Sequence, residues 1–218
     1  MIIMKNSKAK MFNKKASDPK SKADQILETL ALQPGQNIAD IGAGGGYFCL
    51  RFAEAIGRKG KAYAVDTNPE FLEFIRNSAK EKKLNNVKTI LVTKDKLPIP
   101  RKSLDLVFMR NVTHHIPNRV EYFRNLRGVL KPAGRIAVVE YRRSGRFSFH
   151  RLFGHYVNRE IIVKEMVEAG YQLEKEFDFL PEQSFTIFSL KKFNAEAESG
   201  SIISILPVQE ITTIPLIP

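Results

Sequence analysis

Residues 37–53, which read NIADIGAGGGYFCLRFA, decide the fold of this chain. The stretch places an acid, Asp40, and four glycines between two apolar runs. The first run, 37–41, has the length of a short buried strand, and the second, 46–56, has the apolar spacing of a helix. A glycine-rich turn between a strand and a helix lets the backbone approach a bound ligand closely. The stretch therefore predicts a ligand-binding turn at the end of the first strand.

The composition is that of a globular protein with one principal domain. The chain has 218 residues, 43% of them hydrophobic and 27% charged, which is enough to close a proper core. The single cysteine, Cys49, excludes a disulfide framework and a site with several thiolate ligands, and we expect it to pack inside a helix. The four histidines form no cluster with metal-ligand spacing, so no metal is expected. These features favour a reducing, cytoplasmic location.

The net charge of +12 is unevenly distributed. Residues 1–22 contain seven lysines and one aspartate, whereas residues 194–218 contain three glutamates and no basic residue. A basic surface is compatible with nucleic acid, an anionic lipid surface, an acidic partner or simple solubility. Because the chain has no basic motif of known geometry, nucleic acid is not the favoured partner.

The chain divides into three parts by composition. Residues 1–19 predict a loose basic N-terminal arm, residues 20–193 the folded domain and residues 194–218 an apolar tail. Three prolines and a Gln-Glu pair interrupt the apolar run of the tail, which is shorter than the ~20 residues that a spanning helix needs, so no membrane span is expected. The tail is interpreted either as flexible or as an added edge strand that pairs with a second subunit, which leaves a homodimer open.

The folded part alternates between strands and helices. Five apolar runs predict strands, at 37–41, 61–66, 87–92, 104–109 and 135–141. Five amphipathic stretches predict helices, at 20–32, 46–56, 69–84, 118–130 and 158–169. The KPAG sequence at 131–134 predicts a turn, and a hairpin of antiparallel strands ends the domain. Such alternation predicts an α/β fold, with a mainly parallel sheet covered by helices on both faces.

The spacing of the glycines separates two nucleotide-binding patterns. A dinucleotide fold requires G-x-G-x-x-G, but counting from Gly42 places Tyr47 at the third position, which leaves a dehydrogenase poorly supported. The pattern D-x-G-x-G-x-G fits at Asp40, Gly42, Gly44 and Gly46. It resembles motif I of the class I S-adenosylmethionine-dependent methyltransferases.

Further segments resemble the same family in order and spacing. Asp66 ends the second strand as VD, LDLVFMRNVTHHI resembles the fourth strand with its loop, and LKPAG resembles the turn before the fifth strand. The resemblance covers about residues 20–192, and RNVTHHI before LKPAG is most similar to the small-molecule branch that includes quinone-biosynthesis methyltransferases. It implies a Rossmann-like seven-stranded mixed sheet of order 3-2-1-4-5-7-6 with an antiparallel C-terminal hairpin.

The resemblance implies S-adenosylmethionine as cofactor and assigns residues to it. Asp66 would hold the ribose hydroxyls, although it is also compatible with capping the next helix. Asp40 would either pair with the ammonium group of the cofactor or hold the glycine loop through backbone N–H groups. Tyr47 would either close over the methionine tail or cover the core. Near Asp95 the spacing departs from the pattern of the family, because one residue, rather than two, separates this acid from the Leu-Pro that follows it. The cofactor-binding residues predicted in this way are Asp40, Gly42, Ala43, Gly44, Gly46, Tyr47, Asp66, Thr67, Asp95 and Asn111.

Two histidines and a later basic segment are the candidates on the acceptor side. His114 and His115 follow the fourth strand, where one could act as a general base, or they cap the next helix and face solvent. Segment 141–159 mixes arginines with aromatic residues, which suits an amphipathic acceptor with an anionic group, or it is an exposed basic loop. The substrate-contacting residues predicted there are Arg142, Arg143, His150 and His155.

The sequence thus predicts a methyltransferase that acts on a small or lipid-like, anionic acceptor. An RNA or protein methyltransferase is the first alternative, but the N/D-P-P-Y/F motif that presents a planar amine is absent after LDLVFM. Arsenite chemistry is disfavoured because it requires several thiols. The alternative from another class is a non-catalytic binding protein built on the cofactor fold.

Overall fold

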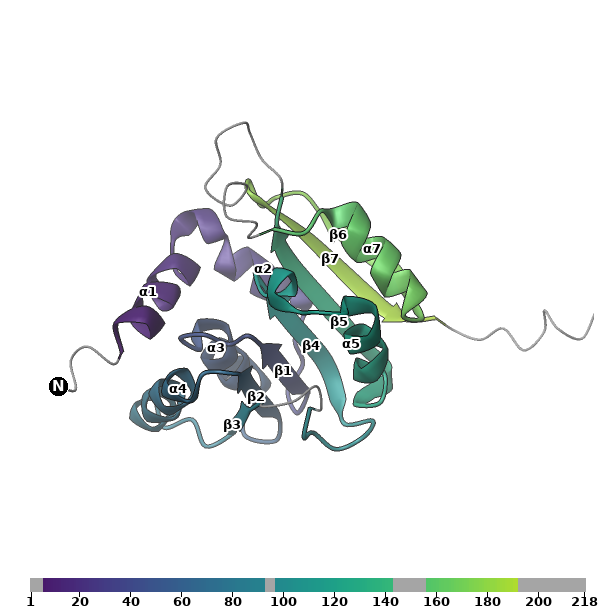
Figure 1. Ribbon diagram of the computed structural model, residues 1–218. Coiled ribbons are helices and arrows are strands. Elements are labelled where there is room, and N and C mark those ends of the chain that lie inside the picture. Colours follow the sequence, from purple (N-terminus) through teal and green to yellow (C-terminus); the bar gives the residue numbers. More distant parts are fainter. Residues whose placement is uncertain (1–5, 93–96, 143–155, 192–218) are drawn as a thin grey trace, which may run out of the picture.

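A computed structural model describes residues 6–92, 97–142 and 156–191 of the chain (Figure 1). Its centre is one seven-stranded sheet of order β3-β2-β1-β4-β5-β7-β6. The strands are β1 (Asn37–Ile41), β2 (Lys61–Asp66), β3 (Val87–Leu91), β4 (Leu104–Arg110), β5 (Leu130–Tyr141), β6 (Tyr171–Phe177) and β7 (Gln183–Leu190). This order confirms the sheet that the family resemblance implied.

The pairing of the strands brings five carboxyl ends to one edge of the sheet. β3, β2, β1, β4 and β5 pair in parallel, so Asp66, Ile41 and Arg110 end neighbouring strands on the same side. β7 runs antiparallel to both β5 and β6, which confirms the predicted C-terminal hairpin. Ligands of open α/β sheets bind at the carboxyl edge.

Helices cover both faces of this sheet. They are α1 (Ser7–Ala16), α2 (Ala23–Leu30), α3 (Tyr47–Ile56), α4 (Pro69–Glu81), α5 (Arg119–Leu126) and α7 (Arg159–Glu168), with short 3₁₀ turns η1 (Pro19–Ser21) and η2 (Thr113–His115). Buried side chains of α2, α3 and α4 share one apolar core, and those of α5 and α7 share the other. Figure 1 shows α5 and α7 together on one side of the sheet.

The inner strands are apolar because each contributes to both cores. Along β1, Ile38 belongs to the core under α2, α3 and α4, whereas Ala39 and Ile41 belong to the core under α5 and α7. Both Ile38 and Ala39 are completely buried. A strand covered on both faces reads as a continuous apolar run rather than as an alternation, and this is why the sequence located β1 and β2 at their observed bounds.

The predicted turn at 131–134 is wrong. These four residues lie inside β5, where Leu130 pairs with Leu104 and Arg135 already pairs with Leu106. β5 therefore carries extra residues at this point and bulges against β4. A Cβ on Gly134 would come within 2.8 Å of the Leu104 carbonyl oxygen, so glycine is required where the bulge approaches β4.

The prediction of a loose N-terminal arm is also wrong for the described residues. Residues 7–16 form α1, which packs on α3 through the buried side chains of Ala9 and Ala16. Asn13 lies on the same face, donates a hydrogen bond to the Gly45 carbonyl oxygen (2.9 Å) and accepts one from the Tyr47 N–H (3.2 Å). The helix was not predicted because two alanines and an asparagine give no clear apolar stripe.

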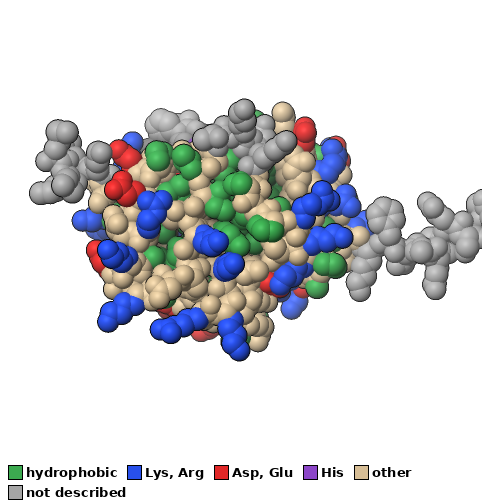
Figure 2. Space-filling view, turned by 90° about the horizontal axis from the view of Figure 1, so that it is seen from below, with side chains coloured by type: hydrophobic (Ala, Val, Ile, Leu, Met, Phe, Trp, Pro, Cys, Tyr) green, Lys and Arg blue, Asp and Glu red, His purple; other side chains and the backbone are tan. Residues whose placement is uncertain are grey.

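Basic side chains dominate the exposed surface that Figure 2 presents. Lys and Arg side chains surround a group of hydrophobic ones there, and acidic side chains are few. Within the described residues, no helix has the length and apolar character needed to cross a membrane. The same residues contain no group of three His, Cys, Asp or Glu side chains placed to hold a metal ion. The tail at 194–218, with its expected second subunit, lies outside the described residues.

Removing the Asn13 side chain is expected to release α1 from the domain. Asn13→Ala deletes two hydrogen bonds to the glycine loop, each worth about 0.5–1.5 kcal/mol. Limited proteolysis with trypsin, which cleaves after lysine, should then cut within α1 faster than in the wild type, while the rest of the domain remains intact. Asn77→Ala, at an exposed site on α4, is the matched control. Equal cleavage of Asn13→Ala and the wild type would show that α1 is held by other contacts.

Candidate active site

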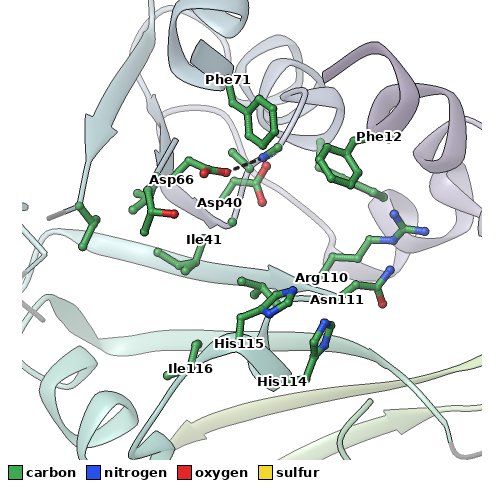
Figure 3. A pocket seen from close by; sticks show the side chains of 18 of the residues that line it. Phe12, Asp40, Ile41, Asp66, Phe71, Arg110, Asn111, His114, His115 and Ile116 are labelled. Carbon is green, nitrogen blue, oxygen red and sulfur yellow. Dashed lines mark hydrogen bonds between the residues drawn. The ribbon is translucent and has the colours of Figure 1, made fainter. Parts of the chain in front are cut away.

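A cavity of about 880 Å³ opens at the carboxyl edge of the sheet (Figure 3). Its volume lies in the upper part of the range found for small-molecule sites. Ten of the residues predicted from the sequence line it, namely Asp40, Gly42, Ala43, Gly44, Tyr47, Asp66, Thr67, Asn111, His114 and His115. The carboxyl ends of β1, β2 and β4 thus bring the predicted cofactor side and the predicted histidines into one cavity.

The carboxylate of Asp66 fixes the loop between β1 and α3. One oxygen accepts a hydrogen bond from the Gly44 N–H and the other accepts one from the Asn68 N–H, both at 2.9 Å. Asn68 itself caps α4 by accepting a hydrogen bond from Glu70, so the helix-cap interpretation of Asp66 is wrong. Asp66 instead connects the glycine loop to the end of β2 and turns its carboxylate toward the cavity (Figure 3).

Glycines are required in this loop for two reasons. They leave space for a ligand, and a side chain at these positions would collide with neighbouring protein atoms. A Cβ on Gly42 would lie 2.6 Å from Val112 Cγ2, and a Cβ on Gly45 would lie 2.2 Å from the Ala9 carbonyl oxygen. Gly46, a predicted cofactor residue, does not line the cavity. It has φ +80° at the start of α3, where a Cβ would lie 2.5 Å from Ile75 Cγ1. Gly46 therefore lets α3 pack against α4.

Asp40 is a buried acid beside this loop. Its exposed fraction is 5%, and the loss of water around it raises its pKa from 3.8 to about 8. The neighbouring Asp66 carboxylate raises the pKa further, whereas the Cys49 N–H and the Arg110 guanidinium oppose the rise. Asp40 is therefore mainly protonated at neutral pH. A cation placed in the cavity would favour its charged form.

Arg110, at the end of β4, is a cavity residue that the sequence did not identify. Burial lowers its pKa, because the guanidinium has lost much of its water. One nitrogen, Nη2, donates to Ser21 Oγ at 3.0 Å, and the guanidinium lies 5.4 Å from the centre of the Phe48 ring. Within the described part of the chain, Arg110 Nε is buried and has no hydrogen-bond acceptor. A buried donor without an acceptor is costly and indicates a place for a ligand oxygen.

Glu140 and His114 form a pair at the ends of β5 and β4. The Glu140 carboxyl is completely buried and accepts hydrogen bonds from the backbone N–H groups of Thr113 and Tyr141, both at 3.0 Å. The Thr113 hydroxyl lies 2.5 Å from it, and His114 Nδ1 lies 3.1 Å from Glu140 Oε1. Because the other groups around this carboxyl donate to it, His114 Nδ1 is assigned as a donor as well. Glu140 therefore fixes the orientation of the His114 ring.

The two histidines differ in their surroundings. The His114 side chain is 6% exposed and is paired with Glu140, whereas His115 is an exposed residue. Their ring centroids are 4.1 Å apart, and both rings line the cavity. Figure 3 shows them across the cavity from Asp40 and Asp66. Of the two predicted candidates, His114 has the arrangement of an oriented base.

The first helix closes one wall of the cavity. Phe12 lines it and meets the ring of Phe71 edge to face, with centroids 5.5 Å apart. Asn13, Lys15 and Ala16 of α1 line it too. No pattern in the sequence identified this wall. Glu140 had a usable signal, because an acid near the end of an apolar strand at the carboxyl edge of the sheet lies close to the loops that form the ligand site.

Asn111 and Arg142 have structural partners. Asn111 adopts φ +53°, donates its N–H to the Val139 carbonyl oxygen and accepts a hydrogen bond from Gln183 at 2.6 Å through its side chain. Arg142 does not line the cavity, and its N–H donates to the Glu182 carbonyl oxygen. The remaining predicted site residues, Asp95, Arg143, His150 and His155, lie outside the described residues.

Comparison with known proteins identifies the family. The profile of a family described as "Methyltransferase domain" matches residues 32–199. A ubiquinone/menaquinone biosynthesis C-methyltransferase from Ectopseudomonas mendocina is 30% identical over 135 residues, which are 60% of this chain and 51% of that protein. An arsenite methyltransferase from Halobacterium salinarum is 28% identical over 54% of this chain and 30% of that protein. The chain thus spans about half the length of the first relative and less of the second.

A solved structure shares the fold over most of the chain. The S-adenosylmethionine-dependent methyltransferase from Aquifex aeolicus superimposes with a TM-score of 0.73 at 20% identity, covering 82% of this chain and 96% of that one. The profile match spans well over half of the chain and includes the glycine loop, both acids and both histidines. The chain therefore belongs to the methyltransferase-domain family of class I S-adenosylmethionine-dependent enzymes.

Proposed function

We propose that the chain transfers the methyl group of S-adenosylmethionine to a small or lipid-like acceptor bound in the same cavity. The observation that carries this proposal is the order of groups along the carboxyl edge of the sheet. The acids Asp66 and Asp40 stand at β2 and β1, and the paired His114 and Glu140 stand at β4 and β5. One cavity thus offers a side for a cationic cofactor and a side for an acceptor.

The residues around the glycine loop fit the cofactor. The Asp66 carboxylate faces the cavity at the end of β2, where it would accept hydrogen bonds from the two ribose hydroxyls. Asp40 would become charged beside the cationic groups of the cofactor. Gly42, Gly44 and Ala43 would present backbone to it, with Tyr47 and Thr67 at its border. The cofactor supplies an activated methyl group, so the protein has to align the reactants and exclude water.

His114 is the proposed base where the acceptor atom carries a proton. With Nδ1–H donated to Glu140, the neutral ring presents Nε2 as its proton acceptor. Glu140 would then stabilise the imidazolium that forms, as a buried carboxylate does beside a catalytic histidine. His115 and the loop around it would position the acceptor, and Asn111 would border the cofactor.

The lining favours an acceptor with an apolar body and an anionic or carbonyl oxygen. Val112, Ile116, Pro117 and Tyr122 supply apolar surface on the histidine side of the cavity. Arg110 Nε supplies the buried donor that lacks an acceptor within the described residues. The quinone methyltransferases among the relatives act on molecules of this general type by their names. The basic segment with Arg142, Arg143, His150 and His155 stays a prediction.

Other acceptor classes have less support. A thiol-dependent arsenite reaction is disfavoured because the one cysteine, Cys49, is completely buried in α3. An RNA or protein acceptor has only the net charge in its favour. A non-catalytic binding protein would not require the pairing of His114 with a buried carboxylate, which costs free energy to bury.

Asp66→Asn is expected to weaken S-adenosylmethionine binding about ten- to a hundredfold. A hydrogen bond to a charged acceptor contributes about 1.5–3 kcal/mol, and the amide replaces the charge that the ribose would contact. Isothermal titration calorimetry measures the dissociation constant. Asp105→Asn is the control, because Asp105 also accepts a backbone N–H (Asn37, 2.8 Å) but lies at the opposite edge of the sheet. Equal weakening in both variants would contradict the proposed role of Asp66.

Cofactor binding is expected to release a proton from Asp40. In the free protein the pKa of Asp40 is about 8, and a bound cation lowers it, so binding below pH 8 expels the proton. The affinity should therefore fall by up to about tenfold for each pH unit below 8. Calorimetry in two buffers of different ionisation enthalpy measures the release. Asp40→Asn should lose that part of the release, and a wild type with the same heat in both buffers would contradict the assignment.

Replacement of either member of the histidine pair is expected to reduce turnover rather than cofactor affinity. Loss of a general base costs about 10²–10⁴ in rate, so His114→Ala should lower kcat by that range on an acceptor with an ionisable proton. Glu140→Gln should lower kcat less and shift its pH profile, because the amide no longer orients the ring or stabilises its charge. Unchanged kcat in both variants with a quinol-type or phenolic acceptor would show that no base acts at this position.

A further inference from the structure

The outward face of α1 carries an uncompensated cluster of lysines. Lys8, Lys10, Lys14 and Lys15 are exposed, and none forms an ion pair with a carboxylate of the described residues. α1 contains no acidic residue. Two further exposed lysines lie close by, Lys20 within η1 and Lys22 directly after it. This end of the molecule thus presents a mainly positive surface, with Asp18 as an exposed acid among the lysines.

The stability of the helix does not explain this arrangement. Lys10 and Lys14 are four residues apart, so their charges repel each other along the same side of α1. Lys8 lies in the first turn, where the helix dipole disfavours a positive charge. Ala9, Asn13 and Ala16 face the domain, and Phe12 packs on Phe71 beside the cavity. Lys8 and the repulsion between Lys10 and Lys14 therefore oppose the folding of α1, whereas the dipole favours Lys14 and Lys15 in the last turn. An external anionic surface would remove the opposing effects.

Two large apolar side chains are exposed among the lysines. Met11 is 44% exposed and Phe12 is 40% exposed, and they are neighbours on α1. Among the described residues, five large hydrophobic side chains have this degree of exposure, and the other three lie on β3 and α7. A short helix that combines lysines with exposed apolar side chains has the composition of a segment that lies on a membrane surface.

The same helix borders the proposed active site. Phe12, Lys15 and Ala16 line the cavity, so a surface that covers the outward side of α1 also lies beside the entrance to the cavity. Figure 3 shows Phe12 at the rim, opposite the histidines.

We propose that the outward face of α1 docks on a membrane that contains anionic phospholipids. The lysines would meet the headgroups, and Met11 with Phe12 would enter the interface between headgroups and acyl chains. The docked chain would receive a lipid-like acceptor directly from the bilayer. This delivery of the acceptor rests on the proposed function.

The chemistry of the face favours lipid over nucleic acid. Its cations on α1 are all lysines, compact point charges that suit the non-directional attraction of an anionic lipid surface. The face has no arginine on α1, whose planar fork would bind phosphate oxygens in pairs. Met11 has no role against a phosphate backbone, but it gains free energy on entering an apolar layer.

Binding of the full chain to lipid vesicles tests the proposal. Vesicles of phosphatidylcholine with about 30% phosphatidylglycerol, and of phosphatidylcholine alone, are floated with the protein at about 0.05 M and about 0.5 M salt. We expect binding to the anionic vesicles only, and its loss at high salt. The variant K8Q/K10Q/K14Q spares the cavity residue Lys15. It should bind about a hundredfold more weakly, at about fivefold for each lysine.

Matched variants separate the face of α1 from the overall charge. K59Q/K80Q/K88Q removes the same charge from exposed sites outside α1 and should bind vesicles like the wild type. M11Q should weaken vesicle binding but leave any binding to single-stranded RNA unchanged. Equal losses in both triple variants would overturn the proposal. So would the absence of vesicle binding at low salt, or a loss of RNA binding alone in the α1 variant.

Two measurements distinguish a failure of membrane docking from misfolding of the variant and from a failure of the proposed function. Circular dichroism and thermal unfolding of K8Q/K10Q/K14Q should give an unchanged or higher midpoint, because like charges are removed from α1. S-adenosylmethionine binding without vesicles tests the proposed function on its own. Normal cofactor binding together with no vesicle binding would reject the docking face and leave the proposed function standing.

Discussion

Parallel pairing of β2, β1, β4 and β5 is the constraint on which the candidate site depends. The carboxyl ends of these strands meet at one edge of the sheet, so polar groups from distant parts of the chain collect there. Asp66 then fixes the glycine loop, and Glu140 fixes the loop that bears His114. Both carboxylates accept backbone N–H groups, so the same bonds that shape the loops also hold the reactive side chains in place.

Much of the sheet could be predicted from the sequence because burial on both faces leaves an unambiguous apolar run. The bounds of β1 and β2 were predicted correctly for that reason. The KPAG segment was misread, since a bulge inside a strand and a turn before it use the same proline and glycine. The partners of Glu140 are its neighbour Tyr141 and the distant Thr113 and His114, so only the folded sheet shows that the charge is compensated.

The N-terminal helix α1 could not be predicted from the sequence for a different reason. Its contact with the domain consists of two alanines, one amide that bonds to the glycine loop, and the ring of Phe12 against Phe71, which together form no regular apolar stripe. Gly45 belongs to the ligand loop and is also a packing site for α1, because a Cβ there would collide with the carbonyl oxygen of Ala9. The resemblance assigned Gly46 to the cofactor, whereas the structure uses it for the packing of α3 against α4. Gly45, which lies outside the fixed positions of the motif, packs against α1.

The position of β7 between β5 and β6 has a consequence for how the chain reaches its final form. β5 ends at Tyr141, yet its second neighbour begins at Gln183, so one edge of an interior strand stays open while residues 142–182 are synthesised. Contacts between such distant segments slow folding, and an open strand edge invites pairing with other chains. The nascent protein therefore closes its sheet only when the last strand arrives, and a chain that stops early exposes an interior strand.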